Sequence, residues 1–175
     1  MVEIRAHSES DIDAVAEVNV RTWRSAYAGI IPAEVLDALD PAEVARRNRN
    51  RATPPGAVTL VAEEHGTIVG FASFGPGRVE QTGSDEYDMS VGELYAIYVD
   101  PGHQRAGTGQ LLLAAAMAGL AEAGFPEMRL WVLAENHPAR RFYERHGLAP
   151  NGETNYYTPR GSTVELPEIR YAVRL

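Results

Sequence analysis

The sequence contains no cysteine and no lysine, and each absence excludes a class of chemistry. Without cysteine there is no disulfide framework, no thiolate metal site and no thiol nucleophile. Without lysine there is neither the amine of Schiff-base catalysis nor the lysine that a Walker-type phosphate loop requires. All 16 basic residues are arginine, which a coding bias explains as well as any function does.

Long apolar runs and a basic surface are missing as well. Residues 1–7 hold no apolar stretch of signal-peptide length, and no run approaches the roughly 20 apolar residues that span a membrane. We therefore expect a cytoplasmic protein with no membrane partner. The net charge of −8 disfavours nucleic acid as a partner, because phosphate contacts need a basic face. We expect no bound metal, since His65, His103, His137 and His146 show no metal-ligand spacing.

The remaining composition is that of one globular domain. The chain has 175 residues, of which 45% are hydrophobic and 23% charged. A chain of this length and composition can bury a hydrophobic core without disulfides or metal ions. It shows no internal repeat, low-complexity tract or linker. We therefore predict a single domain over residues 1–175.

Hydrophobic periodicity and turn residues predict an alternation of helices and strands. The predicted elements are a strand over 2–6, helical segments over 12–27, 33–39 and 42–51, a hairpin of strands 58–63 and 67–74, a polar loop over 75–92, a strand over 94–99, a helix that ends at Gly124, a strand over 128–133, a helix over 138–146, and two strands within 156–175. Ser8 and Asp11 have the spacing of a helix capping box. This order predicts an α/β (α+β) fold with a mixed, mostly antiparallel central sheet and helices on both faces.

The most informative segment runs from Glu93 to Leu113. A buried strand is followed by a turn at residues 101–102 and then by a glycine-bearing loop, 107–109, that opens into a helix. Backbone N–H groups at the positive end of a helix dipole bind phosphate groups. An ordinary strand-to-helix turn is the alternative. A dinucleotide-binding fold would need a third glycine where Leu112 stands, and a repeated strand–helix alternation that this chain lacks.

Two motifs in this region carry a family resemblance. The segment Gln-Arg-Ala-Gly-Thr-Gly at 104–109 resembles the Q/R-x-x-G-x-G/A signature of the GNAT superfamily of N-acetyltransferases. Residues 130–148 are similar to the strand of that family and its N-x-x-A-x-x-F-Y-E-x-x-G-F helix, although Leu148 stands where the family more often has Phe. The two motifs follow each other in the family's order, and the resemblance extends over nearly the whole chain.

The resemblance implies acetyl-CoA as the co-substrate, bound where the central strand splays away from its neighbour. Backbone groups of Ile97, Tyr98 and Val99 would contact the pantetheine arm, and a strand N–H there could face the thioester oxygen. The pyrophosphate would lie on the loop formed by Gln104, Arg105, Ala106, Gly107, Thr108, Gly109 and Gln110.

Three side chains are implied near the reacting atoms. Asn136 would lie beside the pantetheine arm, and Tyr143 would donate a proton or a hydrogen bond to the departing thiolate. Glu93 would help to remove the proton of the amine, directly or through water. Each has a simpler alternative: a helix N-cap for Asn136, core packing beside Phe142 for Tyr143, and a solvated strand-end carboxylate for Glu93.

The acceptor is expected to meet Trp23 and Tyr27, which resemble part of the W-R-x-A-Y segment of some bacterial GNAT proteins; a helical core pair is the alternative. The predicted function is direct transfer of an acetyl group from acetyl-CoA to a primary amine, most simply of a small molecule. A protein or peptide N-acetyltransferase and a non-catalytic acyl-CoA-binding module stay open. The sequence also leaves open whether the chain is a monomer or a homodimer.

Overall fold

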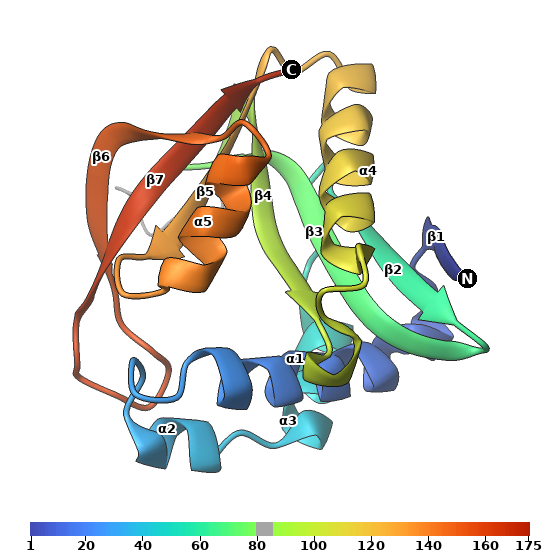
Figure 1. The fold of residues 1–175 in the computed structure, drawn as a ribbon, viewed down its shortest axis with the longest axis vertical. Coiled ribbons are helices and arrows are strands. Elements are labelled where there is room, and N and C mark those ends of the chain that lie inside the picture. Colours follow the sequence, from blue (N-terminus) through green and yellow to red (C-terminus); the bar gives the residue numbers. More distant parts are fainter. Residues whose placement is uncertain (80–85) are drawn as a thin grey trace.

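A computed structural model describes residues 1–79 and 86–175, and its centre is one seven-stranded sheet (Figure 1). The strand order across the sheet is β1-β2-β3-β4-β5-β7-β6. The strands are β1 (Val2–Ala6), β2 (Val58–Glu64), β3 (Thr67–Arg78), β4 (Tyr87–Val99), β5 (Glu127–Leu133), β6 (Ala149–Tyr157) and β7 (Leu166–Arg174).

Helices connect and cover these strands. They are α1 (Ile12–Ala26), α2 (Ala33–Asp37), α3 (Pro41–Asn50), α4 (Thr108–Glu122) and α5 (His137–Arg145), with short 3-10 turns at Glu9–Asp11 and Pro101–His103. The predicted capping box is present before α1, where the Ser8 backbone N donates to Asp11 Oδ2 at 2.8 Å. Arg5 also donates to both oxygens of the Asp11 carboxylate, and these bonds hold the pKa of Asp11 well below its usual range.

Every neighbouring pair of strands is antiparallel except β4 and β5. This parallel pair has only two register positions, Gly92 with Met128 and Glu93 with Arg129. Beyond them the two strands separate, while β4 stays paired with β3 as far as Val99. The predicted mixed, mostly antiparallel sheet with splayed central strands is therefore confirmed.

Helices cover both faces of the sheet, as predicted. On one face α4 buries Leu112, Leu113 and Leu120 in the largest core cluster, which also holds Tyr143 of α5. On the other face, a second cluster joins α1 to β2 and β3. Figure 1 shows α4 over β3 and β4, and α5 over β5 and β7. The two helices on this face thus lie on either side of the separation between β4 and β5.

The prediction of a loop over residues 75–92 is wrong. Strand β3 continues to Arg78 and β4 begins at Tyr87; residues 80–85 of the predicted loop lie outside the described part of the chain. Close packing, and not a turn, requires glycine at positions 75 and 77. A Cβ added at Gly75 would lie 2.7 Å from the Tyr95 hydroxyl oxygen, and one at Gly77 would lie 2.8 Å from Val91 Cγ1.

The last two strands also differ from the prediction. Strand β6 begins at Ala149 instead of near residue 156, and an irregularity between Pro150 and Thr154 shifts its register against β7. Most of β6 is exposed. A strand without a buried face has no alternation of apolar and polar residues for a sequence pattern to detect.

Leu112 and its neighbour Leu111 give a matched test of this packing. Leu112 is fully buried in the core beneath α4, whereas Leu111 is 47% exposed. We expect Leu112→Ala to lower the free energy of unfolding by about 2–5 kcal/mol, because it leaves a cavity in the core. Leu111→Ala should change it by less than about 0.5 kcal/mol. Chemical denaturation of both variants measures the difference, and equal losses would contradict the described packing of α4.

Candidate active site

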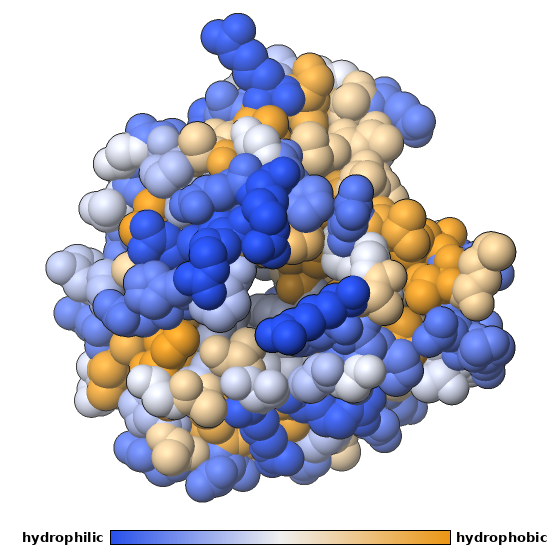
Figure 2. All heavy atoms as spheres, viewed as in Figure 1, coloured by the Kyte–Doolittle hydropathy of each residue, from blue (hydrophilic) through white to orange (hydrophobic). Residues whose placement is uncertain are grey.

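A cleft with a volume of about 1230 Å³ opens where β4 and β5 separate. Figure 2 shows it as a hollow near the centre of the face, with polar groups around its mouth. Pockets for one small ligand have volumes of roughly 300–1,000 Å³, so this cleft has room for two. We call the part lined by loop 104–110 and α5 the loop half. The part lined by Trp23, Tyr27, Tyr98, Tyr157 and Glu168 is the aromatic half.

The loop half is built around the first turn of α4. The first intrahelical hydrogen bond is from Leu111 N to Gly107 O, at 3.0 Å. The N–H groups of residues 108–110 therefore have no acceptor within the helix and are available to a ligand. Gly107 has φ +87°, and a Cβ added to it would meet no atom within 4 Å. Its backbone angle, and not a lack of space, makes glycine the favoured residue at this position.

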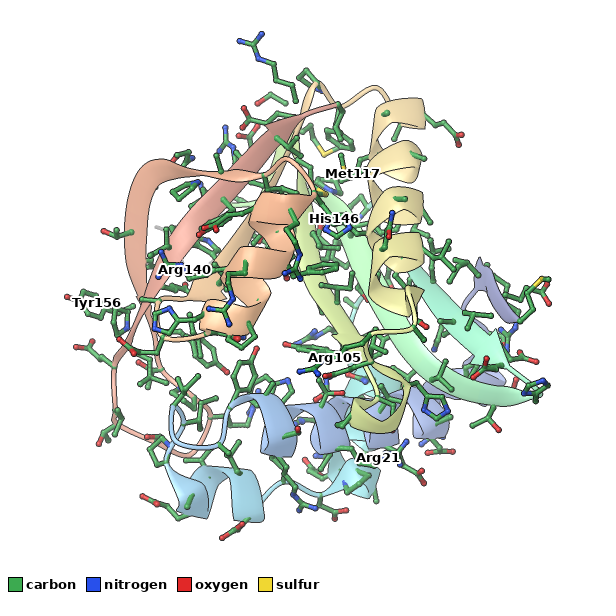
Figure 3. The ribbon with its side chains drawn as sticks, viewed as in Figure 1. Arg21, Arg105, Met117, Arg140, His146 and Tyr156 are labelled. Carbon is green, nitrogen blue, oxygen red and sulfur yellow. The ribbon has the colours of Figure 1, made fainter. Side chains whose placement is uncertain are left out.

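The rest of the predicted loop divides between the cleft and the core. Gln104, Arg105, Gly109 and Gln110 line the cleft together with Gly107, whereas Ala106 and Thr108 are not among its lining residues. Thr108 is only 1% exposed, and its hydroxyl has no hydrogen-bond partner within the described part of the chain. Figure 3 shows Arg105 on the loop before α4 and His146 at the C-terminal end of α5, on two sides of the cleft.

The end of β4 is tied both to this loop and to α1. The Val99 carbonyl accepts from Gln104 Nε2 at 3.0 Å and from Thr22 Oγ1 at 3.3 Å. The next residue, Asp100, accepts from Arg21 Nε at 2.6 Å and from Gly102 N at 3.0 Å. Donor groups from α1 and from the loop thus meet at two consecutive residues, the last of β4 and the one that follows it.

Helix α5 supplies the second wall of the loop half. Asn136 is its N-cap, with Oδ1 accepting from Ala139 N at 3.3 Å, and the same side chain lines the cleft. The alternative prediction, that Asn136 is a helix N-cap, is therefore correct. An N-cap can also contact a ligand, so the expected place of Asn136 beside the pantetheine arm stays a prediction. His146 contributes Nδ1 to a 2.7 Å hydrogen bond with the Phe142 carbonyl, and its ring lies 4.5 Å from the Phe142 ring.

Tyr143 lies where the two halves meet. It is 8% exposed, belongs to the core cluster beside Phe142 and also lines the cleft. Burial raises the pKa of the Tyr143 phenol well above its usual range, and interaction with Tyr98 raises it further. The hydroxyl therefore carries its proton throughout the physiological range, so it can donate a hydrogen bond.

Four rings from α1, β4 and β6 form a wall of the aromatic half. The Trp23 ring is 5.1 Å from Tyr27, 6.4 Å from Tyr157 and 6.5 Å from Tyr98, all in edge-to-face geometry. The Tyr27 and Tyr98 hydroxyl oxygens are 3.5 Å apart. Trp23 and Tyr27 are thus a packed helical pair that also lines the cleft.

The three predicted residues of β4 all line the cleft but face different layers. The side chains of Ile97 and Val99 pack against the core beneath α4, whereas the Tyr98 side chain packs against the cluster beneath α1. Tyr98 therefore presents its ring to the aromatic half. The sequence prediction considered only its backbone.

Glu93 is placed differently from the sequence expectation. It lies within β4, is 2% exposed and is not among the residues that line the cleft. Its carboxylate accepts from Arg78 N at 2.7 Å and from Arg78 Nε at 2.9 Å. The alternative of a solvated strand-end carboxylate is therefore wrong. The expected part in removing an amine proton stays a prediction, and any such contact would have to reach a buried, paired carboxylate.

Several cleft residues were not singled out from the sequence. They include Arg78, Glu86, Tyr87, Trp131, Asn155, Tyr156, Tyr157, Glu168 and His146. They come from the ends of β3 and β4 and from β5, β6, β7 and α5, so no spacing along the chain joins them. Only the sheet order brings them together.

The described residues contain no group of three or more His, Asp or Glu side chains that could hold a metal ion. None of the helices in residues 1–79 and 86–175 is long and apolar enough to cross a membrane.

A family model described as the acetyltransferase (GNAT) family matches residues 18–148, which include both motifs and most of the cleft. The chain belongs to the GNAT family. A GNAT relative in Bacillus subtilis (strain 168), named uncharacterized N-acetyltransferase YuaI, is 38% identical over 156 residues, which cover 89% of this chain and 85% of the relative. With such homologues and this domain, the protein is an N-acetyltransferase.

Solved GNAT structures share the fold over the full chain. PaiA N-acetyltransferase from Thermoplasma acidophilum, in complex with coenzyme A, has a TM-score of 0.72 at 22% identity and covers 100% of this chain and 99% of its own. Ribosomal-protein-alanine N-acetyltransferase from Brucella melitensis has a TM-score of 0.72 at 25% identity, with 99% of each chain covered. A third structure with this fold, a putative phosphinothricin N-acetyltransferase, has a TM-score of 0.73 at 18% identity and covers 100% of this chain and 99% of its own. Its name gives another acceptor, so the fold does not determine the acceptor.

The buried pair of Glu93 and Arg78 can be tested by stability measurements. We expect Glu93→Gln to lower the free energy of unfolding by about 1–3 kcal/mol, because hydrogen bonds to a charged group become neutral ones. Arg78→Gln should also destabilise, since it leaves a buried carboxylate without its guanidinium. In the double variant the two losses should not add. Denaturation of the three variants measures the coupling, and strictly additive losses would show that the pair is not energetically linked.

Proposed function

We propose that this protein transfers an acetyl group from acetyl-CoA directly to the primary amine of a small molecule. The observation that carries the proposal is the continuous cleft between the separated strands β4 and β5. It joins the start of α4 at one end to an aromatic-lined space at the other.

The loop half fits the co-substrate. The N–H groups at the start of α4 suit the pyrophosphate, and Gly107 holds the backbone conformation that exposes them. The β5-facing edge of β4 has no β5 partner beyond Glu93, so backbone groups of residues 97–99 there can pair with the amides of the pantetheine arm. Asn136 lines the same path. When bound, acetyl-CoA supplies the activated acetyl group.

The residues around the meeting point of the two halves favour direct attack. The amine nitrogen forms a bond to the carbonyl carbon of the thioester, the bond from that carbon to sulfur breaks, and the nitrogen loses a proton. Tyr143 is positioned to donate a hydrogen bond to the departing sulfur. With its pKa raised by burial, it is a weak proton donor toward a thiolate, so hydrogen bonding is its main contribution. No cysteine is present to form an acyl-enzyme thioester.

The amine must be neutral before it attacks. An alkyl amine with a pKa of about 10.4 pays roughly 4–5 kcal/mol to lose its proton at pH 7. Glu93 assists this step through water, because its carboxylate is buried, paired with Arg78 and not part of the cleft lining. We expect Glu93→Gln to lower kcat far more than Arg78→Gln does at equal stability. Equal losses would make Glu93 a positioning residue that acts through Arg78.

Two other functions make distinct predictions. A protein or peptide acetyltransferase needs an acceptor half that admits a chain terminus, and would acetylate peptides in preference to free amines. A non-catalytic module would bind acetyl-CoA without releasing CoA from it. The aromatic side chains that line the aromatic half of the cleft favour a small acceptor with an apolar body.

The test begins with ligand binding. We expect acetyl-CoA and CoA, but not NAD or ATP, to raise Tm by several degrees at about a hundred times the dissociation constant. A panel of free amines and short peptides is then assayed by release of CoA. Stabilisation by NAD or ATP alone would overturn the co-substrate. Binding of acetyl-CoA without release of CoA for any acceptor would favour the non-catalytic module.

Tyr143→Phe tests the role of the phenol. We expect kcat to fall about ten- to a hundredfold, the effect of losing one hydrogen bond to a charged group, with little change in the KM for acetyl-CoA. Tyr171→Phe is the control, because it removes a phenol hydroxyl from the same core cluster outside the cleft; this hydroxyl accepts from Arg140 and donates to Glu144 of α5, so the control also reports the effect of loosening that helix. An unchanged kcat in Tyr143→Phe would leave Tyr143 with a packing role only.

A further inference from the structure

The hydroxyl groups of Tyr27 and Tyr98 form a loose pair in the wall of the aromatic half. Their oxygens are 3.5 Å apart, whereas hydrogen bonds between hydroxyl groups are normally about 2.7–2.8 Å long. By contrast, the Tyr171 hydroxyl, outside the cleft, donates to Glu144 at 2.7 Å and accepts from Arg140 at 3.1 Å. The Tyr27 and Tyr98 side chains line the cleft, so their hydroxyl groups can gain a closer partner from a ligand.

Helix α1 holds the Tyr98 hydroxyl from the side away from β5. The buried Trp23 indole N–H has no hydrogen-bond partner among residues 1–79 and 86–175. Burial raises the pKa of the Tyr98 phenol, and Tyr27 and Trp23 oppose this rise as donors toward its oxygen. The indole N–H therefore lies near the Tyr98 oxygen without making a regular hydrogen bond to it. A phenol oxygen has two lone pairs, so it can also accept from a ligand.

Both hydroxyl groups of the pair carry their protons at neutral pH. Burial raises the pKa of the Tyr27 phenol well above its ordinary value, and Tyr98, Tyr143 and Tyr157 raise it further. The pKa of Tyr98 is also raised by burial. Neutral phenols donate and accept hydrogen bonds but do not act as bases. The pair can thus position an amine, and the removal of its proton falls to another group.

The pair lies beside the place where the thioester would react. Tyr98 is opposite Phe71 of β3, on the part of β4 that has no β5 partner. In the proposed function its backbone pairs with the pantetheine arm, while its ring lies in the aromatic half. The Tyr143 phenol, which is positioned toward the departing sulfur, interacts with the phenols of both Tyr98 and Tyr27. An atom held by the pair is therefore close to the sulfur and to the edge of β4.

A primary amine matches the spacing of the two oxygens. In its neutral form it has two N–H groups and one lone pair. At N···O distances of about 2.9 Å, one nitrogen can reach both oxygens of a pair that is 3.5 Å apart. Donation of both N–H groups fixes the direction of the lone pair. A secondary amine has only one N–H group, so it can use only one of the two hydroxyls.

We propose that the hydroxyl groups of Tyr27 and Tyr98 together bind the reacting nitrogen of the acceptor and direct its lone pair at the thioester carbon. Both are then catalytic residues that select a primary amine, and the rings around them favour an acceptor with an aromatic body. This inference rests on the proposed acetyl transfer to small amines. After attack, the nitrogen keeps one hydrogen in the amide and loses the other as a proton, while the bond from the carbonyl carbon to sulfur breaks.

The test compares 2-phenylethylamine with N-methyl-2-phenylethylamine in the native protein, Tyr27→Phe and Tyr98→Phe, by release of CoA. We expect the native protein to prefer the primary amine. Each substitution should lower kcat/KM for the primary amine about three- to tenfold, the effect of one hydrogen bond between uncharged groups. The kcat/KM for the secondary amine should change less than about twofold, because the remaining hydroxyl still accepts its N–H. An unchanged rise of Tm with acetyl-CoA shows that each variant is folded and binds its co-substrate.

Tyr171→Phe is the control for this comparison, because its hydroxyl lies outside the cleft. It should leave the ratio of the two kcat/KM values as in the native protein, even if the loosening of α5 lowers both values. A change of this ratio in Tyr171→Phe would show that the preference does not come from the pair.

Other outcomes separate the two proposals. An unchanged ratio in either Tyr27→Phe or Tyr98→Phe, equal losses for both amines, or a native protein that does not prefer the primary amine would overturn the paired contact while acetyl transfer stands. Turnover of other amines but not of 2-phenylethylamine would overturn it as well, because the aromatic wall belongs to the same site. Release of no CoA with any amine would remove the proposed function itself.

Discussion

The cleft depends on a pairing that stops early. Strands β4 and β5 are parallel neighbours at only two register positions, Gly92 with Met128 and Glu93 with Arg129. A sheet normally continues its ladder because unpaired backbone groups in the interior are costly. Here the ladder ends in the middle of the molecule, and the exposed edge of β4 becomes a place where an extended, amide-containing ligand can complete the pairing.

The two helix layers keep the strands apart. Helix α4 packs on β3 and β4 and α5 packs beside it, with Tyr143 and Leu120 in one core cluster. On the opposite face, Trp23 and Tyr27 fill the space beneath the separated strands without closing it. Two faces of one sheet thus provide two chemically different halves, one rich in free N–H groups and one rich in aromatic rings.

The sequence predicted the parts of the site that are continuous in the chain. Loop 104–110 and Asn136 are each marked by a local pattern, because glycine at a positive φ, an N-cap and a helix start are local requirements, whereas Tyr143 was implied by the resemblance of residues 130–148 to the GNAT helix. It did not predict that β3 and β4 extend through residues 75–78 and 87–92. Glycine and proline there resemble turn signals, although the glycines at positions 75 and 77 are required by close contacts with Tyr95 and Val91. Tertiary packing decided the structure at these positions.

The same distinction explains the side chains of the site. The buried Glu93 carboxylate is paired with Arg78, which is 15 residues away and comes from another strand. Glu168 and Asn155 reach the aromatic half only because β7 lies next to β5 and β6 lies beyond it. Strand order is not a property of any window of sequence, so these residues could not be assigned before the sheet was known.

The strand end at Val99 and Asp100 has a mechanical consequence. Two adjacent residues accept hydrogen bonds from the loop and from α1, so the loop and the helix share one anchor. A ligand that stiffens the loop therefore also restrains the helix that carries Trp23 and Tyr27. The first ligand then bears the loss of conformational entropy that comes with ordering the aromatic wall. The second ligand binds to a surface that is already ordered.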